Sequence, residues 1–156
     1  MALVYRIVKN DESETVFFNG VINEDAELPL GELLEKMGTN CILNLKEIHG
    51  INSLGVRAWI HFMRHLEVNR SVVLEECTPE IINQINMIPN FKGNSIINSL
   101  YARYICDNCE HQQLQFYKAQ ELTGVKALKD VLCEKCGTKM EMEDIEEDFL
   151  AYFRTY

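Results

Sequence analysis

Hydrophobic residues follow two different periods along this chain, and the two alternate over the first hundred residues. Short runs of β-branched and aromatic residues, bounded by turn residues, favour strands. Between these runs, apolar residues three and four positions apart predict helices. The predicted strands are residues 3–8, 14–19, 40–45, 71–75 and 95–105, and the predicted helices are residues 28–37, 53–68 and a segment from Thr78 on. Strands that alternate with helices need crossover connections, so we expect an α/β fold with a mixed, mostly parallel sheet and helices packed on it.

The helix over residues 53–68 carries the clearest apolar stripe in the chain. Apolar side chains recur there every four residues, and two more widen the stripe: Leu54, Ala58, Phe62 and Leu66, with Trp59 and Met63 beside them. We expect this stripe to face the sheet, with the charged residues of the same helix in solvent.

A short polar loop, residues 46–51, joins the strand at 40–45 to this helix. Such a loop lies at the carboxyl end of a strand and the amino end of a helix, where open α/β sheets usually bind ligands. Ser53 opens the helix. Its hydroxyl can cap the helix, worth about 0.5–2 kcal/mol, or it can accept a phosphoryl group that the helix dipole favours. From the residues alone, the cap is favoured.

After residue 104 the chain changes character and becomes rich in cysteine and polar residues. Two Cys-x-x-Cys pairs stand 23 residues apart, formed by Cys106, Cys109, Cys133 and Cys136. Each pair can place two thiolates on one metal, so two turns brought together by a hairpin complete a tetrahedral shell. Gly137 lets the second turn bend around the sulfurs. We predict one structural zinc ion; iron suits the same cage but is the less favoured metal.

The sequence therefore predicts two parts. An α/β domain covers residues 1–104, and a small zinc-ribbon-like β module covers residues 105–156. An acidic run at residues 141–148 precedes apolar residues, which suits a short C-terminal helix that starts with negative charge.

Charge and composition narrow the function. The formal net charge of -9 disfavours binding to nucleic acid or to an anionic membrane surface. No apolar run approaches the roughly 18 residues of a membrane-spanning helix, and the first residues lack the apolar core of a signal peptide. We therefore expect a cytoplasmic protein, in which Cys41 and Cys77 are reduced core thiols.

Enzyme motifs are absent from the sequence. It contains no phosphate loop, no dinucleotide fingerprint, no Gly-x-Ser-x-Gly and no His-Glu-x-x-His. His61 and His65 are four residues apart on one helix face, a geometry that can bind metal, but a half-exposed helix face is the favoured interpretation. His111, next to the first cysteine pair, is read in the same way as a surface residue. We expect a protein that is not an enzyme.

The run NCILNLKEIHGINSLGVRAWIHFM resembles the core of a STAS domain of the anti-sigma-factor antagonist type. That family has a strand ending in Asp-Leu-Ser and a helix start of Asp-Ser-Ser-Gly. The corresponding residues here are Asn44-Leu45-Lys46 and Asn52-Ser53-Leu54-Gly55. The similarity extends over roughly residues 1–100, and the cysteine-rich part lies outside it. Both family acids are asparagines here, which keeps the capping geometry but removes the charge.

The resemblance implies a bacterial regulatory protein without catalytic activity that binds an anti-sigma-factor kinase or a sensor domain. It also implies a phospho-switch at the serine that corresponds to Ser53, although docking is the stronger expectation because the family acids are missing. The expected docking face consists of Lys46, His49, Asn52, Ser53, Gly55 and Arg57.

An alternative is a nucleic-acid-binding zinc ribbon of the transcription or translation machinery. It would need a basic hairpin with aromatic side chains. Between the cysteine pairs, Lys118, Lys126 and Lys129 are diluted by Glu121 and Asp130. We therefore expect protein binding.

Overall fold

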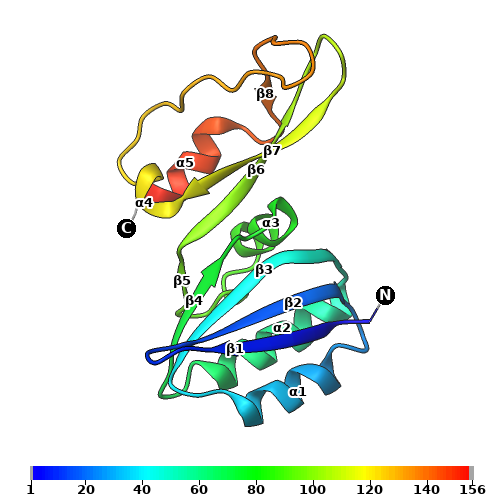
Figure 1. Ribbon diagram of the computed structural model, residues 1–156, viewed down its shortest axis with the longest axis vertical. Coiled ribbons are helices and arrows are strands. Elements are labelled where there is room, and N and C mark those ends of the chain that lie inside the picture. The colour runs from blue at the N-terminus through cyan, green and yellow to red at the C-terminus, as the bar shows by residue number, and fades with distance from the viewer. Residues whose placement is uncertain (1, 155–156) are drawn as a thin grey trace. The chain divides into compact units, whose positions relative to one another are not determined.

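The computed structural model describes residues 2–154, which form two compact units that divide between Asn98 and Ser99 (Figure 1). The first unit holds a five-stranded sheet in the order β1-β2-β3-β4-β5. Its strands are β1 (Val4–Lys9), β2 (Glu14–Ile22), β3 (Asn40–Ile51), β4 (Ser71–Glu75) and β5 (Ile96–Ile97). β1 runs antiparallel to β2, and every later pair is parallel. The predicted α/β class with a mostly parallel sheet is confirmed.

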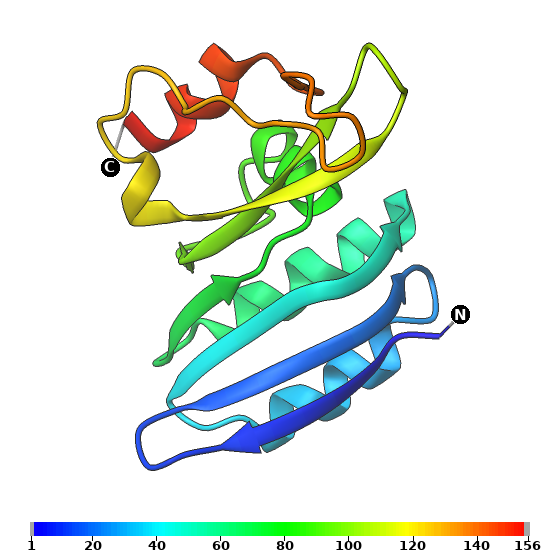
Figure 2. The same ribbon diagram turned by 45° about the horizontal axis from the view of Figure 1, so that its top comes forward.

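Three helices connect the parallel strands: α1 (Glu27–Lys36), α2 (Ser53–Leu66) and α3 (Pro79–Met87). Figures 1 and 2 show α1 and α2 side by side on the same face of the sheet. This is the arrangement that right-handed crossovers produce when the strands follow one another in order. The start of α3 follows its sequence signals, because the Thr78 hydroxyl accepts a hydrogen bond from the N–H of Ile81 at 3.3 Å and Pro79 is the first helical residue.

An aromatic cluster forms the centre of the core between the sheet and α2. The ring of Trp59 lies 5.7 Å from that of Phe18, 5.4 Å from that of Phe62 and 6.0 Å from that of Phe91. All four side chains are buried. Aromatic contacts of this kind add stability beyond the area they bury, so α2 is firmly held to the sheet.

The predicted stripe of α2 is partly wrong at its first turn. Leu54 is 53% exposed and Ala58 is only half-buried, whereas Gly55 and Val56 are buried. The reason is a close approach of two backbones: a Cβ added at Gly55 would overlap the carbonyl of Ile22 at the end of β2. Only glycine fits there, so residues 55 and 56 face the core and the side chain of Leu54 is left in solvent.

The predicted loop over residues 46–51 is also wrong, since β3 continues through it to Ile51. The pairing with β2 shifts register twice, after Phe17 and after Gly20, and each shift adds one residue on β3. Such β-bulges change which side chains face the core. Leu45 and Ile48 are therefore both buried although three positions separate them.

The predicted strand over 95–105 consists of two strands. Ile96 and Ile97 pair in parallel with β4, and the N–H of Asn98 donates to the carbonyl of Leu74 at 2.8 Å. From Ser99 on, the chain pairs antiparallel with a different strand in a second sheet. The first unit thus ends at Asn98, and the boundary expected after residue 104 falls inside a strand of the second unit.

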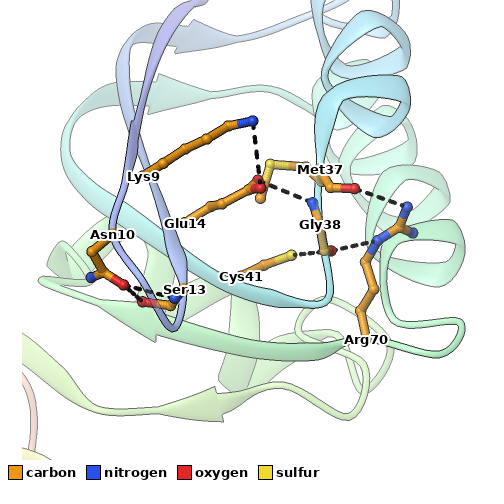
Figure 3. Close-up of polar contacts among 8 residues, drawn as sticks. All are labelled: Lys9, Asn10, Ser13, Glu14, Met37, Gly38, Cys41 and Arg70. Carbon is orange, nitrogen blue, oxygen red and sulfur yellow. Dashed lines mark hydrogen bonds and ion pairs between the residues drawn. The ribbon is translucent and has the colours of Figure 1, made fainter.

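At the amino ends of β3 and β4, a polar cluster fixes the turn between α1 and β3 (Figure 3). Arg70 donates to the carbonyl of Gly38 at 2.9 Å, and the thiol of Cys41 donates to the same carbonyl at 3.4 Å. The N–H of Gly38 donates to the carboxylate of Glu14 at 3.0 Å, and Lys9 lies 3.8 Å from that carboxylate. This end of the sheet is closed by internal contacts, whereas the start of α2 lies at the opposite end.

The second unit is a three-stranded antiparallel sheet in the order β7-β6-β8, with two helices. Its elements are β6 (Ser99–Ile105), β7 (Gln112–Lys118), α4 (Ala119–Leu122), β8 (Glu141–Met142) and α5 (Glu146–Arg154). The rings of Tyr117 and Phe149 lie 6.1 Å apart, and the hydroxyls of Tyr104 and Tyr117 are 2.7 Å apart. A small β module followed by a helix with an acidic first turn agrees with the prediction. None of the helices in the described part of the chain could span a membrane.

Candidate metal centre and docking surface

The two predicted cysteine pairs meet in the second unit. The sulfurs of Cys106, Cys109, Cys133 and Cys136 all lie within 4.8 Å of one another. Separations of 3.5 Å join the sulfur of Cys106 to that of Cys136 and the sulfur of Cys109 to that of Cys133. Four sulfurs in a tetrahedron around zinc, with Zn–S bonds of about 2.3 Å, would be about 3.8 Å apart. The cluster is therefore compatible with a four-sulfur metal site.

The two turns share the same backbone geometry. The N–H of Glu110 donates to the carbonyl of Cys106 at 2.8 Å, and the N–H of Gly137 donates to the carbonyl of Cys133 at 2.9 Å. Glu110 has a φ of 63° and Gly137 a φ of 76°. Both are left-handed conformations, so Glu110 adopts at the first turn the conformation for which the second turn uses glycine.

The hydrogen bonds around the sulfurs favour the ionised form at one position and oppose it at another. The hydroxyl of Thr138 and the amide of Asn108 lower the pKa of Cys136 to about 5. The backbone of His111 lowers the pKa of Cys109, but burial and the neighbouring thiols outweigh it and raise that pKa to about 12. Four thiolates this close repel one another, so a bound cation is what would allow all of them to ionise together.

His111 is half-buried rather than a surface residue. Its Nε2 atom is buried and has no hydrogen-bond partner in the part of the chain that the structure describes. It is not one of the clustered donor groups, which are the four cysteines alone.

At the start of α2 the capping residue is Asn52, and the prediction that Ser53 caps the helix is wrong. The Oδ1 of Asn52 accepts a 2.8 Å hydrogen bond from the N–H of Gly55, and Asn52 has the extended backbone of an N-cap. Ser53 is the first helical residue and its side chain is exposed. Its hydroxyl is therefore available at the helix amino terminus.

Both asparagines that stand where the resembled family has acids are bonded to carboxylates of other elements. The Nδ2 of Asn52 donates to Glu24 at 2.9 Å, and this bond lowers the pKa of Glu24. The Nδ2 of Asn44, which is 5% exposed, donates to Glu75 at 3.1 Å and to Glu76 at 2.6 Å. Negative charge is thus present at both positions, but on neighbouring segments.

The six residues of the expected docking face do not form one compact patch. Ser53 and Arg57 lie one helical turn apart, and both are exposed beside Asn52. Lys46 and His49 are exposed on β3, where a rise of about 3.3 Å per residue puts Lys46 roughly 16 Å along the strand from Ile51. Gly55 is buried against β2 and is a packing residue.

Beside Ser53, a groove of about 360 Å³ runs between the starts of α1 and α2. It is lined by Glu24, Glu27, Leu54, Arg57, Ala58 and His61. Sequence reasoning missed the two glutamates, because nothing in the local pattern shows that the segment before α1 lies beside α2. It also placed Leu54 in the core, whereas that side chain borders the groove.

A larger hollow of about 870 Å³ lies in the second unit beside β7. Gln113, Gln115 and Tyr117 line it together with side chains of α4 and of the segment up to Glu134. None of the predicted site residues borders this hollow.

No protein-family model and no curated protein sequence matches this chain. Among solved structures, an anti-sigma factor antagonist from Mycobacterium paratuberculosis is similar with a TM-score of 0.50 and 13% identity, over 61% of this chain and 86% of that one. The unphosphorylated anti-sigma factor antagonist SpoIIAA matches with a TM-score of 0.41 and 18% identity, over 60% and 86%. A structure of Mglu matches with a TM-score of 0.41 and 18% identity. The matched region covers 44% of this chain and 18% of the Mglu chain. The first of these similarities, at 13% identity, shows a shared α/β fold and nothing beyond the fold.

Proposed function

We propose that this protein is a bacterial regulatory protein that acts without catalysis, by binding another protein at the start of α2. We call this region the Ser53 surface and define it by exposed side chains: Glu24, Asn52, Ser53, Leu54 and Arg57. Lys46 and His49 lie further along β3 and are not part of it. The similarity of fold to an anti-sigma factor antagonist supports this class of function. An anti-sigma-factor kinase or a sensor domain is the partner that this class suggests.

The exposed side chain of Leu54 is the observation that carries the proposal. It is 53% exposed in the first turn of α2, beside the groove that Glu24 and Arg57 line. An apolar side chain that projects among charged ones suits the centre of a protein interface, where apolar groups become buried and a polar rim surrounds them. The neighbouring Ser53 hydroxyl completes a surface that combines apolar, basic and acidic groups.

Phosphorylation of Ser53 is the second part of the proposal. A phosphate there would lie at the amino end of α2 and one turn from the guanidinium of Arg57, and both features favour negative charge. The carboxylate of Glu24, bonded to the adjacent Asn52, opposes it. Docking therefore needs only the unmodified Ser53 surface. A phospho-switch also needs a kinase that accepts Asn52 before Ser53.

For the second unit we propose one structural zinc ion held by Cys106, Cys109, Cys133 and Cys136. Four thiolates fill a tetrahedral shell and leave no position for substrate or water, so the ion would hold the unit together instead of reacting. The same donors also suit iron, but we propose zinc because it has no redox chemistry that could disturb a purely structural site.

The alternative function, nucleic-acid binding through the zinc unit, has less support. Residues 99–156 contain 7 Lys and Arg against 11 Asp and Glu, a net charge of -4. Four thiolates with one zinc ion would add -2 to this value. Such a charge repels phosphate, and salt-dependent binding to RNA or DNA would be the observation in its favour.

The proposal is tested by capturing partners from the lysate of cells that make the protein, with the wild-type chain and variants as bait. The double substitution Ser53→Asp and Leu54→Ala should abolish capture of a partner that the wild type retains. Val68→Ala is the matched control, because Val68 is 61% exposed, apolar and just beyond the far end of α2. Equal capture by the double variant and the wild type would refute docking at the Ser53 surface.

A further inference from the structure

We propose that His61 and His65 form a second metal site on α2, one that takes a divalent transition-metal ion. The two residues are one helical turn apart and both side chains are exposed. Their ring centroids are 4.3 Å apart, with an angle of 48° between the ring planes. Two imidazoles that lie side by side at this separation can each give one nitrogen to the same ion.

A hydrogen bond fixes which nitrogen of His65 is free. Its Nδ1 lies 2.9 Å from the backbone carbonyl oxygen of His61. A carbonyl oxygen only accepts hydrogen bonds, so Nδ1 carries a proton, and in the neutral ring the lone pair is on Nε2. This is the arrangement found in metal-binding histidines, in which the second ring nitrogen donates to a carbonyl or carboxylate and thereby orients the ring.

Both acidic and basic side chains surround His61, and they have opposite effects on a bound cation. Glu24 and Glu27 lie across the groove that His61 lines, and a cation is attracted to their carboxylates. Arg57 and Arg64 on α2 itself oppose it. Two imidazole ligands leave at least two positions to water, so the ion is held more weakly than one inside four thiolates.

The class of ion follows from the donor set. Neutral imidazole suits Ni²⁺, Cu²⁺ and Zn²⁺, and affinity rises along the first transition row up to Cu²⁺. Hard cations such as Mg²⁺ and Ca²⁺ prefer oxygen ligands and should not bind. Ni²⁺ is the best probe, because copper has the stronger tendency to react with the cysteine sulfurs.

The test uses the full-length chain loaded with one zinc ion, dialysed to equilibrium against a series of NiCl₂ concentrations. Nickel and zinc in the protein are both measured by elemental analysis. The wild type should take up one nickel ion per chain and keep its zinc. Loss of even an outer-shell partner lowers metal affinity roughly 10–100-fold, so His61→Gln and His65→Gln should each weaken nickel binding at least tenfold.

His49→Gln is the matched control, because His49 is an exposed histidine on β3 and should leave nickel binding unchanged. All three substitutions are at the surface, and unchanged circular dichroism establishes that each variant is folded. Nickel binding that persists in His61→Gln or His65→Gln would overturn the proposal, as would nickel uptake matched by an equal loss of zinc.

Discussion

The side chain of Asn52 links the start of α2 to the segment before α1. Its Oδ1 accepts from the N–H of Gly55 at 2.8 Å, and its Nδ2 donates to the carboxylate of Glu24 at 2.9 Å. The residue thus caps the helix and holds a negative charge beside Ser53. An aspartate could cap the helix equally well, but it would repel Glu24. The asparagine and the glutamate therefore act as a pair.

We predict that Asn52→Ala lowers the free energy of unfolding of the first unit by about 1 kcal/mol, the usual cost of losing an N-cap. Ser53→Ala should change it by less than about 0.5 kcal/mol, as expected for an exposed position. Urea unfolding followed by the fluorescence of Trp59, the single tryptophan, measures both values in the same unit. A larger loss from Ser53→Ala than from Asn52→Ala would show that the cap has been assigned to the wrong residue.

Asn44→Asp should destabilise the protein in a pH-dependent way. The new carboxylate would stand where an amide now donates to Glu75 and Glu76, so three acids would crowd a buried position. Loss of these bonds should cost about 1–3 kcal/mol at pH 7.

The sign of the pH dependence follows from the same crowding. The crowding raises the pKa values of these carboxyl groups in the folded state. The loss of stability is therefore largest at a pH well above the usual pKa of a carboxyl group, where all three are ionised, and it becomes smaller as the groups take up protons at lower pH. Unfolding curves at pH 7 and at pH 4.5 measure the change. Asn19→Asp, at an exposed position on β2, is the control, and a loss that grew toward low pH would contradict this reasoning.

The two cysteine turns should respond in opposite directions to changes at equivalent positions. Gly137→Ala forces a side chain into a φ of 76° and should lower the stability of the zinc-loaded second unit by about 1 kcal/mol. Glu110→Gly removes a side chain from a φ of 63° and should be neutral or stabilising by up to about 1 kcal/mol. The chelator concentration needed to unfold the unit measures both. Strong destabilisation by Glu110→Gly would mean that its side chain has a role of its own.

Removal of the metal should unfold the second unit and leave the first intact. Binding of a structural zinc ion is folding free energy for a small module, so a chelator or Cys133→Ser should abolish the near-ultraviolet signal of its tyrosines. Trp59 lies buried in the first unit, and its fluorescence should not change.

Alkylation under the same conditions provides a second measure. Chelation should make four cysteines reactive, whereas Cys41 and Cys77 should stay protected because both are buried and burial raises the pKa of each thiol, that of Cys77 to about 12. A chelator that left the tyrosine signal and the alkylation count unchanged would exclude a structural metal.

The sequence predicts most of the fold, because each element of the first unit carries its own local signal. Thr78 and Pro79 mark the start of α3, and the cysteine spacing anticipates the cluster in the second unit. The second half of β3 has no such signal. Its bulges put Leu45 and Ile48 on the same face, so the period-two pattern of a strand is lost there.

The chemistry around α2 was harder to predict, because it depends on residues that are distant in sequence. Glu24 and Asn52 are 28 positions apart, and Asn44 and Glu76 are 32 apart. A motif read along the chain shows two asparagines without charge. Only the fold shows that each of them is bonded to a carboxylate.

The most direct test of the central claim, that partners dock at the Ser53 surface, is hydrogen–deuterium exchange of the full-length protein alone and bound to a partner isolated by capture. Binding should slow exchange at backbone amides of residues 52–57 and in the segment around Glu24. Exchange in the second unit and around Arg70 should stay as it is in the free protein. Protection confined to the second unit, with residues 52–57 unchanged, would contradict the account.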